Sequence, residues 1–424
     1  MQIKTYKKML IMALCCPLMS IAQQNTSSTY SAYGIGDFQN QGLSLNNDLG
    51  GLGVALRPKQ NLNPTNPASL SALTSATFEA GAKGMALWQK GQHANETFHS
   101  VTLSHLSLGF PIREGLAVSG GLLPYSFQGY DITSTTIQSS ESIGQQYKGT
   151  GGINRAYLNV GVEVISGLSL GLTGSAFFGQ LDQQIDTTSS DGQVLVGRLD
   201  DSYSMRAQTI EIGLQYRRDF EDKKVTVGAV FRPESQFDLS RNKSTRTYDD
   251  TGLNIDTLIT EQSEISTVLP KSYVFGLALE KEAHWLVSAE YDFRETSKMY
   301  LMEEVFPHQL RNATQMKLGG WWIPDAQDIH NYRNTIQYRA GLNYKSGHLT
   351  VLSGADESME TDIHEMSLSL GLGLPIKRSK TTANLGLEVG RRGTQDAGLV
   401  EESFIKFHLA FTFNDNWFSQ RKID

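Results

Sequence analysis

From Thr77 onward, apolar and polar side chains alternate along the chain with a period of two. The clearest case is the last stretch, where Ile405, Phe407 and Leu409 share one face while Lys406 and His408 share the other. Successive side chains of a strand point to opposite faces, so this pattern predicts strands with one apolar face. The same alternation predicts fourteen strands, at 76–89, 98–110, 115–129, 152–164, 167–183, 197–217, 223–239, 257–280, 284–295, 310–323, 334–345, 360–374, 381–392 and 402–413.

The strands of a soluble β-sandwich also alternate apolar and polar side chains. Strand length and the alternation of short and long connections distinguish a membrane barrel from such a sandwich. Most of the predicted strands exceed the soluble mode of about five or six residues and match the nine to eleven, or more, of tilted spanning strands. Short connections lie near 111–115, 165–167, 218–223, 281–284 and 375–381; long polar ones lie near 131–151, 184–196, 240–256, 296–309 and 347–359, and 325–333 is intermediate. An even strand number with short turns on one side and long loops on the other is typical of outer-membrane barrels. We therefore predict an all-β fold, a 14-stranded antiparallel transmembrane β-barrel with an N-terminal hatch or plug.

The first 22 residues have the features of a secretory signal peptide. A basic start precedes the apolar run Met9–Cys16 and a small-residue junction at Ser20–Ala22. The run is too short to span a membrane as a helix. Lipidation is an alternative, but neither Cys15 nor Cys16 follows the small residue that a lipobox needs. With both cysteines in the removed segment, the mature chain can form no disulfide and no thiolate metal site.

Composition divides the remaining chain into two predicted domains, an N-terminal hatch at 23–75 and the barrel at 76–424. Residues 23–75 are polar and glycine-rich, without periodicity. The glycine pair Gly34 and Gly36 could suggest a nucleotide-binding loop, but no Gly-Lys-Ser/Thr and no amphipathic helix follow it. The formal net charge is -7, without a basic block, which argues against nucleic acid as a partner.

The hatch region ends with Asn-Pro-Thr-Asn-Pro-Ala-Ser-Leu at 63–70. Two Asn-Pro steps fix turns and exclude a continuous helix or paired strand. The Asn66 side chain can accept a hydrogen bond from its own backbone two residues on, and Pro67 restricts the turn. An ordinary linker turn is the alternative, but a long barrel behind this stretch favours the hinge of a plug. We predict Asn63, Pro64, Asn66, Pro67 and Ala68 as hatch or gate residues.

The third predicted strand contains Gly120-Gly121-Leu122-Leu123-Pro124. Proline cannot donate to a strand ladder, and paired glycines weaken a strand interior. We therefore predict a lateral opening in the wall at Gly120, Gly121 and Pro124, with polar groups of the hatch beside it, because lipid cannot satisfy unpaired backbone groups. The alternative is a bulge near the outer rim.

Several motifs resemble the long-chain fatty acid transporter (FadL) family of outer-membrane barrels. They are Gly50-Gly51-Leu52-Gly53-Val54-Ala55 followed by Asn66-Pro67-Ala68, the hairpin from Leu269-Pro270-Lys271-Ser272 to His284-Trp285, and Gln337-Tyr338-Arg339-Ala340-Gly341. The closing Asn416-Trp417-Phe418 and the Ala22-Gln23 junction resemble the Bacteroidetes branch. The resemblance implies an N-terminal hatch, a kinked third strand that opens into the membrane, and diffusion of hydrophobic substrates without a cofactor. Pocket residues of the family find no counterparts by position, so a fatty acid substrate is not implied.

For the other candidate sites, the sequence favours a structural role over a functional one. The inward charges could mark a polar solute path, but we expect a lumenal salt-bridge network; they are Glu163, Glu290, Asp292, Lys317, Arg339, Glu388, Lys406 and His408. Three histidines, His93, His99 and His105, are spaced by six residues and give little support for a metal site. No hydrolase, metalloprotease or nucleotide-loop motif is present, so we predict no catalytic residues and no cofactor.

Two functions remain open from sequence. The first is passive transport of hydrophobic or amphipathic small molecules across the bacterial outer membrane. The second is a non-transporting scaffold subunit of a secretion or outer-membrane protein assembly complex. Expected partners are outer-membrane lipids, with either a hydrophobic substrate or the subunits of such a complex.

Overall fold

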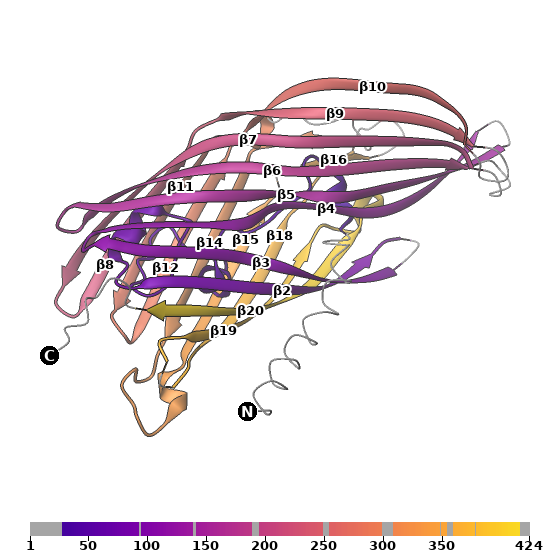
Figure 1. The fold of residues 1–424 in the computed structure, drawn as a ribbon. Helices are drawn as coiled ribbons and strands as arrows, with labels where there is room; N and C mark the ends of the chain where they lie inside the picture. Colours follow the sequence, from indigo (N-terminus) through magenta and orange to yellow (C-terminus); the bar gives the residue numbers. More distant parts are fainter. Residues whose placement is uncertain are drawn as a thin grey trace, which may run out of the picture.

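The computed structural model describes residues 28–92, 95–138, 141–188, 195–248, 254–298, 308–347, 349–353, 359–377 and 379–415 (Figure 1). The predicted signal peptide, both cysteines, His93 and the segment 416–424 lie outside these residues. No helix in the described ranges is long and apolar enough to cross a membrane.

Fourteen antiparallel spanning strands form a closed barrel, as the sequence predicts. Strand β2 pairs with β20 along its whole length, from Ala76↔Asp415 to Lys90↔Glu401, and so closes the sheet. Two spanning strands are each interrupted once, at Pro233 and at Pro270, where proline offers no N–H to the ladder. The strands are β2 (Ala76–Lys90), β3 (Asn95–Arg113), β4 (Leu116–Gln138), β5 (Glu141–Ile165), β6 (Leu168–Thr188), β7 (Leu195–Phe220), β8 (Lys223–Arg232) continued by β9 (Ser235–Tyr248), β10 (Asn254–Leu269) continued by β11 (Ser272–Lys281), β12 (Trp285–Arg294), β14 (Ala313–Trp322), β15 (Gln337–Ser346), β18 (Glu365–Pro375), β19 (Thr382–Arg392) and β20 (Glu401–Asp415).

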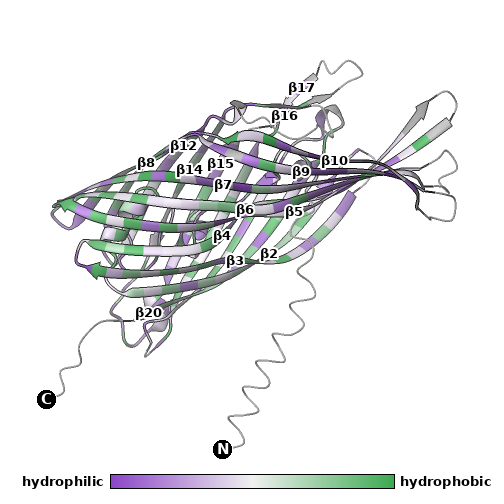
Figure 2. Cartoon of the chain, turned by 45° about the horizontal axis from the view of Figure 1, so that its top comes forward, coloured by the Kyte–Doolittle hydropathy of each residue, from purple (hydrophilic) through white to green (hydrophobic). Residues whose placement is uncertain are grey.

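The alternation assigns apolar side chains to the outside of the barrel. On β20, Phe407 is 50% exposed whereas His408 is 7% exposed, and on β12 Val287 is 53% exposed whereas Glu290 is 7% exposed. Green apolar and purple polar residues accordingly alternate along the strands in Figure 2. A closed sheet with an apolar outer face satisfies every condition for a β-barrel in the outer membrane.

Strands β4 to β10 extend well beyond the rest of the barrel (Figure 1). Strands β5 and β7 have 25 and 26 residues, whereas β14 and β15 have 10 each. The prediction of long loops at 131–151, 184–196 and 240–256 is therefore mostly wrong, because much of each segment is paired strand. Polar residues such as Ser, Thr and Gln dominate these segments, and the aliphatic side chains that the structure describes there face inward rather than outward, so the outward apolar alternation of the spanning strands is missing.

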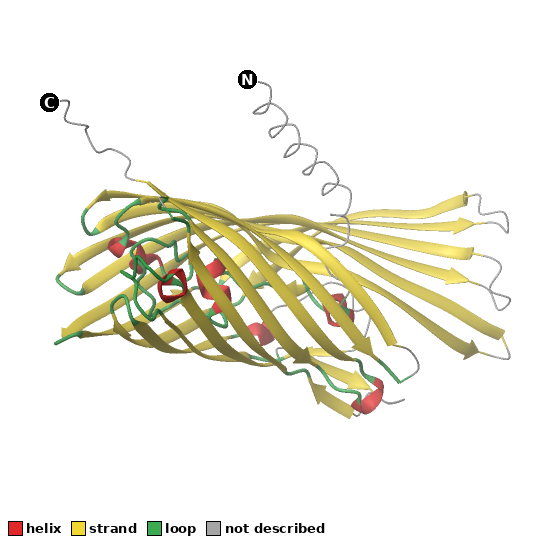
Figure 3. Cartoon of the chain, turned by 90° about the horizontal axis from the view of Figure 1, so that it is seen from below, coloured by secondary structure: helices red, strands yellow, loops and turns green. Residues whose placement is uncertain are grey.

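Residues 28–75, which we call the inner segment, lie inside the barrel (Figure 3). The inner segment contains η2 (Thr29–Ala32), β1 (Asp37–Phe38), α2 (Ser44–Asp48) and η3 (Pro67–Ala72). Helix η3 contacts β5 and β6, while α2 contacts β18 and β19. The hydrophobic core lies between the inner segment and the wall; one cluster joins Leu49 and Leu52 to Ala278 and Leu286.

A separate three-stranded sheet consists of β13 (His308–Leu310), β16 (Leu349–Ser353) and β17 (Met359–Asp362). Leu349 and Val351 of this sheet pack with Tyr30 of the inner segment. The predicted strands 310–323 and 360–374 are shortened as a result, because their first residues belong to this small sheet. Short helices η4 (Thr296–Lys298), η5 (Tyr332–Thr335) and η6 (Asp396–Gly398) lie in connections between strands.

Candidate functional site

Asn63 holds the inner segment in its folded shape. Its side-chain Nδ2 donates hydrogen bonds to the carbonyl oxygens of Gly53 (2.7 Å) and Leu56 (3.1 Å), and its Oδ1 accepts one from Thr65 Oγ1 (2.6 Å). The side chain is buried, as is the adjoining Pro64. Asn63 therefore clamps the Gly53–Leu56 turn and satisfies backbone groups that no secondary structure pairs.

Asn66-Pro67-Ala68 fixes the inner segment to the wall. Asn66 Oδ1 accepts a hydrogen bond from the Ala68 N–H (3.0 Å), as the sequence predicts, and so caps helix η3. Its Nδ2 donates to the carbonyl oxygens of Val54 (2.8 Å) and Leu214 (3.2 Å), the latter on β7. The five predicted hatch residues are thus brought together and buried. A gating role for them remains a prediction.

A band of inward-facing glycines lets the backbone of the inner segment lie directly on the strands. A Cβ atom at Gly213 would lie 2.2 Å from Asn66 Oδ1, and one at Gly341 would lie 2.1 Å from the Leu49 carbonyl carbon. Glycine in a strand interior is unfavourable, so such a band indicates close backbone approach. We call it the glycine belt; its members are Gly161, Gly171, Gly213, Gly228, Gly276, Gly319, Gly341, Gly371 and Gly386.

Members of the glycine belt are paired across neighbouring strands. Gly161 is the Cα partner of Gly171, which is also the partner of Gly213, and Gly371 is the partner of Gly386. Sequence analysis missed the belt. The sequence does show a glycine at an inward-facing position of one strand after another. That pattern predicts a belt only when the strand register is known, because the register decides which residues lie at the same height in the barrel.

Three charge contacts, two buried and one partly exposed at Glu163, tie the inner segment to the wall. Asp48 accepts a hydrogen bond from Arg339 Nη1 at 2.8 Å, with both side chains 1% exposed. Arg57 donates to Glu163 at 2.7 Å. On β12, Glu290 Oε2 accepts the N–H groups of Gly53 (2.9 Å) and Val54 (2.8 Å), and Oε1 accepts from Lys317 (2.6 Å).

The remaining predicted inward charges also have partners. Lys406 is 3.1 Å from Glu388, which lies 3.9 Å from His408, and Asp292 lies 3.8 Å from Arg294. The predicted lumenal salt-bridge network is therefore confirmed. Its larger role was missed, since three of the eight predicted charges, Glu163, Glu290 and Arg339, contact the inner segment.

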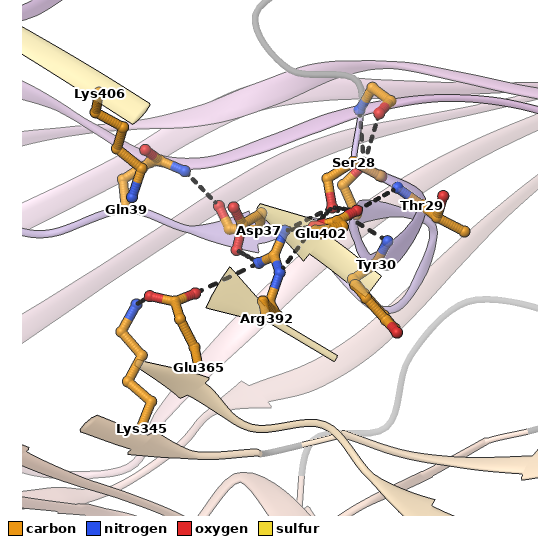
Figure 4. A network of polar contacts seen from close by, with 12 residues as sticks. Ser28, Thr29, Tyr30, Asp37, Gln39, Lys345, Glu365, Arg392, Glu402 and Lys406 are labelled. Atoms are coloured by element: carbon orange, nitrogen blue, oxygen red, sulfur yellow. Dashed lines mark hydrogen bonds and ion pairs between the residues drawn. The ribbon is translucent and has the colours of Figure 1, made fainter. Parts of the chain in front are cut away.

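Arg392 of β19 is the centre of a second anchor, shown in Figure 4. It donates to Asp37 Oδ1 (2.7 Å), Ser28 Oγ (2.5 Å) and Glu402 Oε2 (2.7 Å). Burial alone would raise the pKa of the Asp37 carboxyl, but the Arg392 guanidinium beside it holds that pKa below its usual range. Glu365, itself bound to Lys345 at 2.8 Å, lies 3.7 Å from the same guanidinium.

Glu79 forms a third anchor and accounts for one of the histidines. Its Oε1 accepts hydrogen bonds from the Ser44 N–H (3.0 Å) and hydroxyl (2.5 Å) and lies 3.1 Å from His105 Nε2; its Oε2 accepts from Thr412 (2.9 Å). His99 is exposed on β3. No group of three or more His, Cys, Asp or Glu residues suited to a metal ion occurs in the described part of the chain.

The wall between β3 and β4 is only partly paired. Pairing runs from Arg113↔Leu116 to Leu106↔Leu122 and then stops. In that register the next two pairs would join His105 to Leu123 and Ser104 to Pro124, and Pro124 has no N–H to donate. We call the unpaired region, between 95–105 of β3 and 123–138 of β4, the lateral gap.

The three predicted residues of the opening have different positions. Gly120 and Gly121 lie in the paired part, opposite Leu108 and Ser107, whereas Pro124 lies where pairing is lost. The register shift of β4 against β5 falls between Pro124 and Ser126, which makes Tyr125 a bulge.

The inner segment covers the β4 edge of the lateral gap. The Gln39 N–H donates to the Tyr125 carbonyl (2.9 Å), Gln41 Nε2 donates to the Pro124 carbonyl (3.0 Å), and β1 pairs with Ser126 and Phe127. These contacts supply the polar groups that a membrane wall needs at a break in its ladder.

A cavity of about 190 Å³ lies between the inner segment and the wall. Ser104 lines it on the β3 side of the lateral gap, and Pro124 and Tyr125 line it on the β4 side. Charged side chains surround the rest, among them Lys83, Lys345 and Glu365. The cavity is therefore amphipathic, with its break in the wall next to aromatic Tyr125.

Several solved structures share this fold. The CymD monoaromatic hydrocarbon channel is 16% identical with a TM-score of 0.59, over 89% of this chain and 99% of that one. The Pseudomonas putida toluene transporter TodX is 15% identical with a TM-score of 0.60, over 90% and 100%. A Pseudomonas aeruginosa FadL homologue is 12% identical with a TM-score of 0.58, over 90% and 99%. At these identities the likeness shows a shared fold.

A search of the curated proteins found no significant match to this sequence. A protein-family model described as BamG matches residues 3–424. Since that match extends over nearly the entire sequence, the chain belongs to the BamG family.

Proposed function

We propose that this protein is a passive outer-membrane channel for hydrophobic or amphipathic small molecules. The inner segment acts as its hatch, within a domain at 23–75, and the lateral gap acts as the exit into the membrane. The observation that supports this proposal most strongly is the loss of β3–β4 pairing at Pro124, next to a cavity lined by Ser104 and Tyr125. Diffusion through such a route needs no cofactor and no catalytic residue.

The structural neighbours support this proposal. They include a monoaromatic hydrocarbon channel and a toluene transporter, and each shares the barrel over most of its length. The charges around the cavity favour a molecule with one polar end over a pure hydrocarbon. Assignment to the Bacteroidetes branch stays part of the proposal.

The test restores the missing backbone donor at the exit. Pro124→Val supplies an N–H toward β3 and should slow uptake of a radiolabelled alkyl amphiphile into proteoliposomes by about tenfold or more. Gly121→Val is unsuitable as an added change, because its Cβ would lie 2.4 Å from the Leu106 carbonyl oxygen. Pro233→Val, at a break in the wall away from the lateral gap, is the matched control. Unchanged uptake by a correctly inserted Pro124→Val barrel would refute the exit.

A second candidate function is a scaffold subunit of a secretion or assembly complex. The observation in its favour is the firm anchoring of the inner segment by charge contacts and the glycine belt. A scaffold requires a sealed lumen, which such anchoring provides. Affinity purification at native expression level separates the candidates: stoichiometric partners favour the scaffold, and isolation alone favours the channel.

A further inference from the structure

The β4 edge is only half covered by the inner segment. Residues 125, 127 and 129 of β4 bond to the inner segment through Gln39, β1 and Ser31; Ser31 Oγ accepts the Gly129 N–H (3.0 Å) and donates to the Gly129 carbonyl (2.9 Å). Along a strand, backbone groups face alternate sides. The N–H and C=O groups of Asp131, Thr133 and Thr135 therefore face the same side as those of Gly129. Among the described residues no main-chain partner occupies that side of Asp131, Thr133 or Thr135.

This uncovered edge lies beyond the membrane. The apolar outward row ends at Phe178 on β6 and at Ile210 on β7, and farther along outward positions hold residues such as Asp182 and Ser202, which are hydrogen-bonded to each other. Level with the free edge, Gln146 donates a hydrogen bond to Asp131 (2.7 Å). The outward side chains around this part of β4 are therefore polar.

We propose that the free edge of β4 from Asp131 to Thr135 accepts a β-strand from a different protein chain at the cell surface. The inner segment already uses the adjoining half of the same edge by strand addition through β1, so the interface continues along one line. Like β1, a strand there would run antiparallel to β4 and bond to it through the main chain.

The two faces of the sheet define the side chains of that strand. On the inner face, a row of neighbouring residues is apolar: Ile132, Tyr147, Ile185 and Leu199 are partners from β4 to β7. On the outer face, Asp131 and Lys148 begin a polar row. The partner strand therefore alternates apolar and polar residues.

The edge lacks the usual protection against strand addition. Residues 131–134 include one charged side chain, Asp131, and no proline or lysine. Natural edge strands use proline and lysine to prevent pairing with another strand. The opposite border of the same extension, β10, carries the exposed Asp256, Glu261 and Glu264. Two upright copies in one membrane present β4 in the same direction, so they cannot form the antiparallel pair that a twofold dimer would need.

The experiment places a photoreactive amino acid at the exposed Thr135 of the full chain in cells. We expect one adduct with a different protein, identified by mass spectrometry. Thr133→Pro removes an N–H on the open side without touching the β5 ladder, and should reduce the adduct at least tenfold. Thr133→Val retains that N–H and should leave the adduct unchanged.

Amide hydrogen exchange gives the second readout. In native membranes the amides of Asp131, Thr133 and Thr135 should exchange at least tenfold more slowly than in the purified protein. Four results would overturn the proposal: no adduct with fast exchange, an adduct that survives Thr133→Pro, an adduct with residues of this chain before Ser28, or an adduct between two copies.

Discussion

Glu290 should hold the Gly53-Val54 turn of the inner segment against the wall, and Glu290→Gln should release that turn. The carboxylate accepts both backbone N–H groups at 2.9 and 2.8 Å and pairs with Lys317 at 2.6 Å. A hydrogen bond to a charged group contributes about 1.5–3 kcal/mol. Loss of the charge at two such bonds, with Lys317 left unpaired, should cost about 3 kcal/mol of local stability.

Amide hydrogen exchange of residues 53 and 54 measures this local opening directly. A loss of about 3 kcal/mol corresponds to roughly 150-fold faster exchange, at 1.4 kcal/mol for each tenfold. The matched control is Glu388→Gln, which neutralises another lumenal carboxylate that pairs with Lys406 and, within residues 28–75, makes no hydrogen bond or ion pair with the inner segment. Exchange at 53 and 54 should stay within about twofold of wild type in this control.

The double variant Glu290→Gln with Lys317→Met separates the two causes. Removing the unpaired ammonium should restore part of the protection, because an isolated buried charge carries much of the cost. Exchange that rises less than threefold in Glu290→Gln would refute the anchoring role, as would an equal rise in Glu388→Gln.

Three further changes test the other anchors. Gly213→Ala places a methyl group where the inner segment packs, and should lower the thermal stability of the barrel by about 1–3 kcal/mol, whereas Gly174→Ala, with open space around its Cβ position, should not. Arg392→Met leaves buried carboxylates unpaired and should speed exchange at 28–38 by tenfold or more, whereas Arg391→Met, at a largely exposed ion pair, should leave it unchanged. Hydrogen bonds from Lys224 and Lys59 lower the pKa of Glu282 to about 2, so the stability that this contact adds is present above about pH 4.5 and is lost as the pH falls from 4.5 toward 2. The melting temperature of the wild type should therefore fall more than that of Glu282→Gln between pH 4.5 and 2. Melting temperatures that depend on pH in the same way in both proteins would contradict this role of Glu282.

The spanning strands were predictable because the alternation of apolar and polar residues within each strand is enough to identify it. A strand such as β20 alternates Ile405, Phe407 and Leu409 with polar residues, and lipid on one side with polar lumen on the other dictates that order locally. The break at Pro124 was predictable for the same reason, since the missing N–H is a property of the residue itself.

The contacts of the inner segment were not predictable from one sequence. Asp48 and Arg339 are separated by 291 residues, and their pairing depends on the register of strands between them. The glycine belt has the same dependence. Gly161, Gly171 and Gly213 become one surface only when three strands share one register.

The anchors also decide which part of the barrel can open. Displacing the whole inner segment would break the contacts of Asp48, Arg57, Glu290 and Arg392 together. Of these contacts, the Asp48–Arg339 pair and the Glu290 hydrogen bonds are buried; breaking a buried pair costs about 3–5 kcal/mol, and two hydrogen bonds to a charged group contribute about 3–6 kcal/mol. Together they would cost more than about 6 kcal/mol, so fewer than about one molecule in 10⁴ would be open at any moment. Opening the lateral gap costs less, because its ladder is already interrupted and it is covered by the neutral amides of Gln39 and Gln41 beside one charged anchor, Asp37 of β1. Under the proposed channel function, a molecule that crosses this barrel would therefore pass beside a seated inner segment, and its exit would depend on Pro124 more than on the Asn-Pro turns.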